Sequence, residues 1–147
     1  ACVVVGRCCL GRPWLFADLV ESFNGGEKKV LPSLHQVSEV MYRHGELIVD
    51  YFESEDRGCR DLRKHMAWYL KGFRVHSELR RQFGMVGSLN ELRSLLNQLD
   101  DQPYPVDVAE KPRGRTSSGR PPTLPDGWLN DPDEMIHLDA EDMFSGG

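Results

Sequence analysis

The chain has 147 residues, of which 28% are charged and 39% are hydrophobic, and its formal net charge is -5. These values are typical of one soluble domain with an attached segment, and the length excludes a complete eight-stranded β/α barrel, which takes roughly 250 residues. Apolar runs end before the roughly 20 residues of a membrane span, and the N-terminus lacks the features of a signal peptide. Because the first residue is Ala, we expect a piece of a longer protein.

The cysteines and histidines predict neither a disulfide framework nor a metal site. The cysteines are Cys2, Cys8, Cys9 and Cys59, and they form no CxxC pair. Such spacing is typical of a reducing compartment, so we expect a cytoplasmic location. No histidine stands four residues from another histidine or a cysteine, as a metal site on a helix would require, and we expect no metal.

The first 26 residues predict a strand, a glycine-containing loop and a helix. Residues 2–5 form a continuous apolar run, mostly β-branched, that is typical of a strand buried on both faces of a parallel sheet. Residues 14–23 predict a helix, with Pro13 near its first turn and two glycines after its end. A strand of this kind needs neighbouring strands with which to pair.

Residues 33–99 predict four helices joined by short connections. Ser33 and Gln36 form a capping box that begins the first of them, and Ser88 and Glu91 form another that begins the last. The predicted helices cover residues 33–52, 55–71, 77–85 and 88–99. Gly72 is expected just after the end of the second. Apolar residues recur at helical spacing in these segments, so we expect a small antiparallel bundle.

The chain changes character near residue 100. Residues 1–99 carry 14 Lys and Arg against 12 Asp and Glu, whereas residues 100–147 carry 4 against 11 and seven of the nine prolines. We therefore expect three parts: residues 1–26, a helical domain over 27–99, and a disordered, acidic, proline-rich tail over 100–147. The apolar residues from Trp128 onward leave two roles open, docking on an unknown protein or solubilising the chain.

The loop after the predicted strand is the first candidate site. Gly6 would expose backbone N–H groups near the positive end of a helix, where phosphate groups bind, and Arg7 could hold phosphate oxygens with two hydrogen bonds. Phosphate sites in β/α barrels often follow the last two strands. The alternative is that Gly6 and Gly11 only permit a tight turn while Arg7 and Arg12 are solvated, and the two glycines do not separate these interpretations.

A cluster of cations between residues 57 and 81 is the second candidate site. Eight Lys and Arg residues stand there against two acids, a surplus of six. Several would share one helical arc of about 100°, opposite the apolar face, with an indole at its edge for stacking on a base. The predicted RNA-contacting residues are Arg60, Arg63, Lys64, Trp68, Lys71, Arg74, Arg80 and Arg81. If four of them contact phosphates, the slope of log affinity against log salt should be about -3. A solvated helix face is the alternative.

The adjacent cysteines and His65 are weaker candidates for a functional role. Cys8 and Cys9 stand near a helix N-terminus, where thiolates are favoured, but no base is close in sequence and we expect a packing role. His65 falls between the apolar and basic arcs, which favours a hydrogen-bonded boundary residue over a catalytic one.

Two stretches of the sequence resemble a known enzyme family. They are residues 4–7 (Val-Val-Gly-Arg) with 10–16 (Leu-Gly-Arg-Pro-Trp-Leu-Phe), and residues 63–70 (Arg-Lys-His-Met-Ala-Trp-Tyr-Leu) with 79–81 (Leu-Arg-Arg). Together they resemble the C-terminal portion of bacterial tRNA-dihydrouridine synthases, most closely the B-type of actinobacteria. The resemblance covers about residues 1–99, and the tail has no recognised counterpart.

The resemblance implies an enzyme in which an FMN-bearing β/α barrel precedes a helical tRNA-binding domain, and in which NADPH drives reduction of uridine to 5,6-dihydrouridine in tRNA. It implies that residues 1–26 are the last strand, loop and helix of the barrel and that Gly6 and Arg7 match the FMN-phosphate pair. The overall fold is then mainly α. The family's catalytic loop cysteine has no match here, so this chain alone should be inactive. A stand-alone helical module that binds RNA or protein is the competing interpretation.

Overall fold

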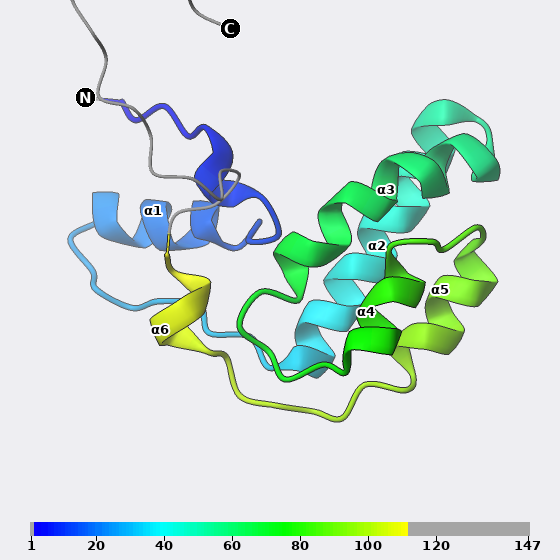
Figure 1. The fold of residues 1–147 in the computed structure, drawn as a ribbon. Coiled ribbons are helices and arrows are strands. Elements are labelled where there is room, and N and C mark those ends of the chain that lie inside the picture. Colours follow the sequence, from blue (N-terminus) through cyan, green and yellow to red (C-terminus); the bar gives the residue numbers. More distant parts are fainter. Residues whose placement is uncertain (1, 112–147) are drawn as a thin grey trace, which may run out of the picture. The chain divides into compact units, whose positions relative to one another are not determined.

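The computed structural model describes residues 2–111, and this part of the chain is mainly helical (Figure 1). The elements are a short 3-10 helix η1 (Arg7–Cys9) and the helices α1 (Leu15–Phe23), α2 (Leu34–Phe52), α3 (Glu55–Tyr69), α4 (Ser77–Phe83), α5 (Leu89–Leu96) and α6 (Val106–Ala109). The prediction of a mainly α fold is confirmed, as are the five predicted helices, three of which end two or three residues early. None of the helices described has the length and hydropathy needed to cross a membrane.

The helix starts follow the sequence signals closely. At α2, the N–H of Ser33 donates to Oε1 of Gln36 at 2.9 Å, and the capping box is complete. At α5, the hydroxyl of Ser88 accepts from the backbone N–H of Glu91, but the Glu91 carboxylate accepts from the N–H of Gly87 at 2.7 Å instead. The second capping box is therefore displaced by one residue, and it still satisfies two N–H groups at the start of the helix.

The core lies between α2, α3, α4 and α5. Helices α2 and α3 pack side by side and antiparallel (Figure 1). Their contact is close because Gly58 has no side chain: a Cβ atom there would lie 2.8 Å from the Cα of Val49. The fully buried side chains include Leu34, Val37, Met41, Leu62, Met66, Leu70, Phe83, Val86 and Leu92. Apart from Phe83 and Val86, these residues lie on the apolar faces that the helical periodicity predicts. Burying them is the main source of stability.

The predicted strand over residues 2–5 is absent. Residues 2–6 carry no regular secondary structure, and the side chains of Val3 and Val4 are 57% and 93% exposed. A β-strand is stabilised by hydrogen bonds to neighbouring strands, and residues 2–111 contain no other strand that could supply them. The loop and helix that follow are formed, so only the strand of the predicted strand-loop-helix unit is wrong.

The prediction of disorder from residue 100 onward is also wrong for residues 100–111. Tyr104 and Ala109 are buried, and the ring of Tyr104 meets that of Trp14 edge to face at 5.8 Å. The backbone of Gln102 accepts a hydrogen bond from Leu34, and its side chain is hydrogen-bonded to the backbone of Arg74 in both directions. The low average apolar content of this segment did not predict its packing, because two or three buried apolar side chains are enough to attach it to the helical bundle. The rest of the predicted tail, residues 112–147, lies outside the described part.

Candidate nucleic-acid interface

The predicted phosphate pair lies at the surface at the start of η1. Gly6 and Arg7 are both exposed, and a Cβ atom built at Gly6 would meet nothing within 4 Å. No side chain caps the N-terminus of η1. Within residues 2–111, the guanidinium of Arg7 takes part in no ion pair. The start of η1, which no side chain caps, and a cation without an ion pair in this part of the chain therefore lie side by side.

The other half of this loop is fixed against the bundle. Arg12 is only 9% exposed, and its Nη2 lies 3.0 Å from Asp18 and 3.4 Å from Glu110. Gly11 has φ +62, and a Cβ atom there would lie 2.3 Å from the carbonyl carbon of Trp68. The interpretation of Gly11 as a tight-turn residue is therefore confirmed, whereas a solvated Arg12 is wrong. A guanidinium can be buried here because two carboxylates face it.

Three cations of α3 gather around a shallow surface hollow. We call it the α3 hollow, and it is lined by Phe52, Arg57, Arg60, Asp61 and Lys64. Two of the cations form exposed ion pairs, Arg60 with Asp56 at 3.1 Å and Lys64 with Asp61 at 2.6 Å. Exposed pairs of this kind contribute only about 0 to 1 kcal/mol each. A phosphate group could therefore replace either carboxylate at little cost.

Several predicted RNA-contacting residues are directed at the protein itself. The Nε of Arg63 donates to the carbonyl of Val86 at 2.8 Å, and the Nζ of Lys71 donates to that of Lys111 at 3.2 Å. These bonds point to different parts of the fold, so the two side chains do not share one open face with Arg60 and Lys64. The cations that helical geometry places on one arc of α3 therefore do not form one open face, because segments packed around α3 engage some of them.

Arg80 is the clearest case of a cation with structural bonds. Its Nη2 donates to the carbonyls of Leu70 at 2.9 Å and Phe73 at 2.7 Å, and its Nε donates to that of Val75 at 3.1 Å. Burial lowers the pKa of Arg80 from its usual value. The carbonyls follow the end of α3, where backbone acceptors have no partner within the helix. Arg80 therefore closes the C-terminal end of α3.

The remaining predicted residues lie near the surface. Arg81 is exposed and pairs with Glu78 at 2.6 Å, a hydrogen bond that lowers the pKa of Glu78 and raises that of Arg81. Arg74 is exposed, and Trp68 is partly buried with its ring 5.2 Å from that of His65. The predicted surplus of six positive charges over residues 57–81 overstates the local charge, because Asp56, just before this range, pairs with Arg60.

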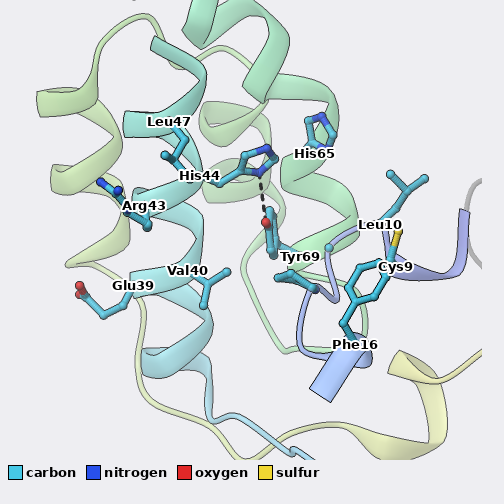
Figure 2. A pocket seen from close by; sticks show the side chains of 12 residues that line it. Cys9, Leu10, Phe16, Glu39, Val40, Arg43, His44, Leu47, His65 and Tyr69 are labelled. Carbon is cyan, nitrogen blue, oxygen red and sulfur yellow. Dashed lines mark hydrogen bonds between the residues drawn. The ribbon is translucent and has the colours of Figure 1, made fainter. Parts of the chain in front are cut away.

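A cavity of about 520 Å³ lies between the N-terminal loop and the helices α2 and α3. We call it the ring cavity (Figure 2), and its lining residues are Cys9, Leu10, Gly11, Pro13, Phe16, Glu39, Val40, Arg43, His44, Leu47, His65 and Tyr69. Most of this lining is apolar. The two walls come from segments far apart in the sequence, so the sequence alone gave no sign of it.

Three ring side chains, together with Glu39 and Arg43, form the polar part of the ring cavity. The hydroxyl of Tyr69 lies 3.0 Å from Nδ1 of His44, a contact drawn as the dashed line in Figure 2. The imidazole rings of His44 and His65 meet edge to face at 4.8 Å. His65 Nε2 is 4.0 Å from Asp61, which also lines the α3 hollow. The predicted boundary position of His65 is confirmed, since the residue lies between core and surface.

Burial sets the protonation of these rings. It lowers the pKa of both His44 and His65, although Asp61 opposes the effect in each, and it raises the pKa of Tyr69 to about 12. At neutral pH, Tyr69 is therefore protonated and both imidazoles are neutral. If the Tyr69 hydroxyl donates to His44 Nδ1, then His44 Nε2 carries the proton and can act as a donor.

The cysteines are free thiols. Cys2 and Cys8 are exposed, and Cys9 is intermediate. Cys59 is fully buried in the core, and desolvation raises its pKa, which makes it a poor nucleophile. Residues 2–111 hold no group of three histidine, cysteine or acidic side chains arranged to bind a metal ion.

Comparison with known proteins identifies the family. The family model described as dihydrouridine synthase matches residues 1–104. The chain belongs to this family. The synthase resemblance in the sequence is thereby confirmed, and the match extends past residue 99 into the segment that contains Tyr104.

Individual relatives of the chain agree with the family match. Over 147 aligned positions, 99% of the chain, it is 51% identical to a probable tRNA-dihydrouridine synthase of Mycobacterium leprae and 49% identical to one of Mycobacterium tuberculosis. It is 32% identical to tRNA-dihydrouridine synthase B of Proteus vulgaris over 60% of the chain. The mycobacterial alignments include the tail, so the view that the tail has no counterpart is wrong.

The chain spans only part of these relatives. It covers 38% of the Mycobacterium leprae protein and 37% of the Mycobacterium tuberculosis protein. No solved structure matches it.

Proposed function

We propose that this synthase-family chain supplies the tRNA-docking part, and half of the cofactor-phosphate site, of a tRNA-dihydrouridine synthase. The full enzyme is an oxidoreductase that reduces uridine to 5,6-dihydrouridine in tRNA, with NADPH as reductant and FMN as cofactor. The support is membership of the family over residues 1–104 and the printed names of the mycobacterial relatives. A cytoplasmic location follows from the tRNA substrate.

We assign residues 1–26 to the end of a barrel whose other strands lie outside this chain. The support is the loop and helix, which are formed in the expected order, and the apolar surface left on α1. Val20 and Phe23 on this helix are both 61% exposed. Contiguous exposed apolar side chains of this size usually mark a surface that packs against another part of the protein.

Gly6 and Arg7 would hold the phosphate of FMN. They fit that role because the backbone at Gly6 has open space where a Cβ atom would stand, and because Arg7 is exposed and carries no carboxylate partner within residues 2–111. A guanidinium matches phosphate geometry with paired hydrogen bonds. When bound, FMN supplies the hydride chemistry between NADPH and the uracil ring. We assign no catalytic residue to this chain.

The α3 hollow is the observation that carries the docking role. It places Arg57, Arg60 and Lys64 together at the surface, with ion-pair partners that are exposed and weakly bound. RNA phosphates that replace Asp56 and Asp61 would release counterions from the RNA, which makes affinity strongly dependent on salt. Three of the other predicted residues act mainly within the fold, namely Arg63, Lys71 and Arg80. The remaining three lie at the margin of the proposed interface, namely Arg74, Arg81 and Trp68.

Fluorescence anisotropy of a labelled tRNA transcript tests this proposal. Titrations from about 50 to about 200 mM salt should give a slope of log affinity against log salt of about -2 to -3 for three phosphate contacts. The variant Arg57→Gln/Arg60→Gln/Lys64→Gln should bind more weakly and show a slope near zero. Lys28→Gln, which removes an exposed cation from the connection between α1 and α2, is the matched control and should keep the original slope.

The proposal is rejected if the triple variant binds tRNA with the affinity and slope of the unmodified chain. Arg74→Gln and Arg81→Gln, measured in the same way, show whether the interface extends beyond α3. A reduction of the slope by about one in either variant would add that residue to the interface.

A further inference from the structure

The ring cavity has the size and lining of a binding site for a small ring. Its volume of about 520 Å³ lies within the roughly 300 to 1,000 Å³ common for small-molecule sites. Apolar side chains from two walls line it, with Leu10 and Phe16 on one side and Val40 and Leu47 of α2 on the other (Figure 2). A flat ring placed between these walls would be covered on both faces.

The polar groups of the cavity select among possible occupants. His44 and His65 are neutral at neutral pH because burial lowers the pKa of each. The Nδ1 of His44 is already hydrogen-bonded to the Tyr69 hydroxyl, which leaves the Nε2 of His44 for a ligand, while the neutral ring of His65 has one donor and one acceptor nitrogen. A purely aliphatic side chain in the cavity would bury these nitrogens without partners, which is unfavourable. A heteroaromatic ring with donors and acceptors along its edge would satisfy them.

The cavity adjoins the α3 hollow. Asp61 lines the hollow and lies 4.0 Å from His65, which lines the cavity, while Lys64 precedes His65 in the chain and lines the hollow. One turn of α3 therefore separates a cationic surface from a mostly apolar recess. The two charged residues that line this recess, Glu39 and Arg43, form exposed ion pairs with Arg93 and Glu46. A nucleotide has the same division, with an anionic phosphate and an uncharged, flat base.

We propose that the ring cavity receives one unpaired base of the RNA whose phosphates contact the α3 hollow. The inference rests on the proposed tRNA-docking function and adds to it a recognition site for single-stranded RNA. Proteins that bind unpaired nucleotides commonly combine a cationic track with rings on which bases stack, and they hydrogen-bond the edges of those bases. His44 and His65 provide the ring edges, and Leu47 and Phe16 cover the base.

The experiment compares two labelled probes bound by the complete chain at one salt concentration. The first is an oligouridylate of about twelve nucleotides, and the second is an abasic ribose-phosphate chain of the same length. The unmodified chain should bind the oligouridylate at least about fivefold more tightly, the lower range for stacking of one base. The same preference should be absent from Leu47→Trp, in which an indole fills the cavity from its exposed rim.

Two further variants keep the test decisive. Phe16→Trp fills the cavity from the opposite wall, which covers the case in which Leu47→Trp fails to fold, and it should also remove the preference. Val108→Trp adds an indole at an exposed position of α6 that does not line the cavity, and it should keep the preference. The salt dependence should be unchanged in all three variants, because none removes a cation.

Equal affinity of the unmodified chain for the two probes would overturn the inference, and so would a preference that survives both cavity-filling variants. In either case the cavity would be left to a polypeptide occupant. Failure of the proposed function gives a different result, because a chain that binds neither probe has no RNA-docking surface at all. Loss of the base preference alone leaves the salt slope and the α3 hollow intact.

Discussion

Replacement of Arg80 by glutamine should unfold the end of α3 without affecting RNA binding directly. The guanidinium of Arg80 is shared among the carbonyls of Leu70, Phe73 and Val75, with three hydrogen bonds of 2.7 to 3.1 Å. Glutamine is too short to reach all three carbonyls. Two of these carbonyls belong to residues whose side chains are buried in the core, Leu70 at 1% exposure and Phe73 at 5%.

The size of the effect follows from these bonds. Hydrogen bonds with a charged partner contribute about 1.5 to 3 kcal/mol each when buried, and neutral ones about 0.5 to 1.5. Arg80 is only partly buried, so a value of about 1 kcal/mol for each bond is reasonable, and the free energy of unfolding should fall by about 3 kcal/mol. In a domain of this size, that corresponds to a fall in the thermal midpoint of roughly 12 °C or more.

Urea denaturation followed by circular dichroism measures this free energy. Arg81→Gln is the matched control, because the neighbouring Arg81 is exposed and its contacts, an ion pair with Glu78 and a hydrogen bond to the Met85 sulfur, are exposed as well, so its loss should cost less than about 1 kcal/mol. The reasoning is refuted if both variants have the same stability. It is also refuted if Arg80→Gln is as stable as the unmodified chain while its tRNA salt slope falls, since Arg80 would then be an RNA ligand.

Three other predictions concern the stability of the folded unit. Gly11→Ala should lower the free energy of unfolding by at least about 2 kcal/mol, because its Cβ would lie 2.3 Å from the Trp68 backbone at φ +62, whereas Gly6→Ala should be tolerated; thermal melts of both variants decide this. A chain ending at Gln102 should melt below one ending at Lys111, since it loses buried Tyr104, worth about 2 kcal/mol, and equal midpoints would show that residues 103–111 do not pack. The free energy of unfolding should fall as pH drops below about 6.5, because the pKa values of His44 and His65 are lowered in the folded chain and the unfolded chain therefore binds protons more readily. A thermal midpoint that is constant from pH 7.5 to 5.5 would contradict this. So would a midpoint that falls just as steeply in the variant His44→Gln/His65→Gln.

Local signals in the sequence were sufficient for most of the helices. The capping residue Ser33 and the apolar periodicity after it predict α2 almost to the residue. Helix starts and buried faces depend on residues a few positions apart, so a single sequence contains them. The prediction of a strand over residues 2–5 was wrong for the opposite reason. A strand depends on partner strands that are distant in the sequence, and residues 2–111 include no partner strand.

The candidate site was predicted less completely because side-chain partners are set by tertiary contacts. Helical geometry placed Arg60 and Lys64 correctly on an exposed face of α3. The same geometry had no information about the carbonyls that engage Arg63 and Arg80, which come from the connections around α4. The ring cavity could not be predicted for the same reason, since its walls meet only when the N-terminal loop folds onto α2 and α3.

Photo-crosslinking of a tRNA transcript containing 4-thiouridine, followed by mass spectrometry of the protein, tests the central claim most directly, because it maps the RNA contacts of the folded chain without any substitution. The α3 hollow and the adjoining ring cavity predict crosslinked peptides that contain Phe52, His65 or the loop around Leu10. Crosslinks confined to α4 and α5, or their complete absence from these peptides at low salt, would contradict the account.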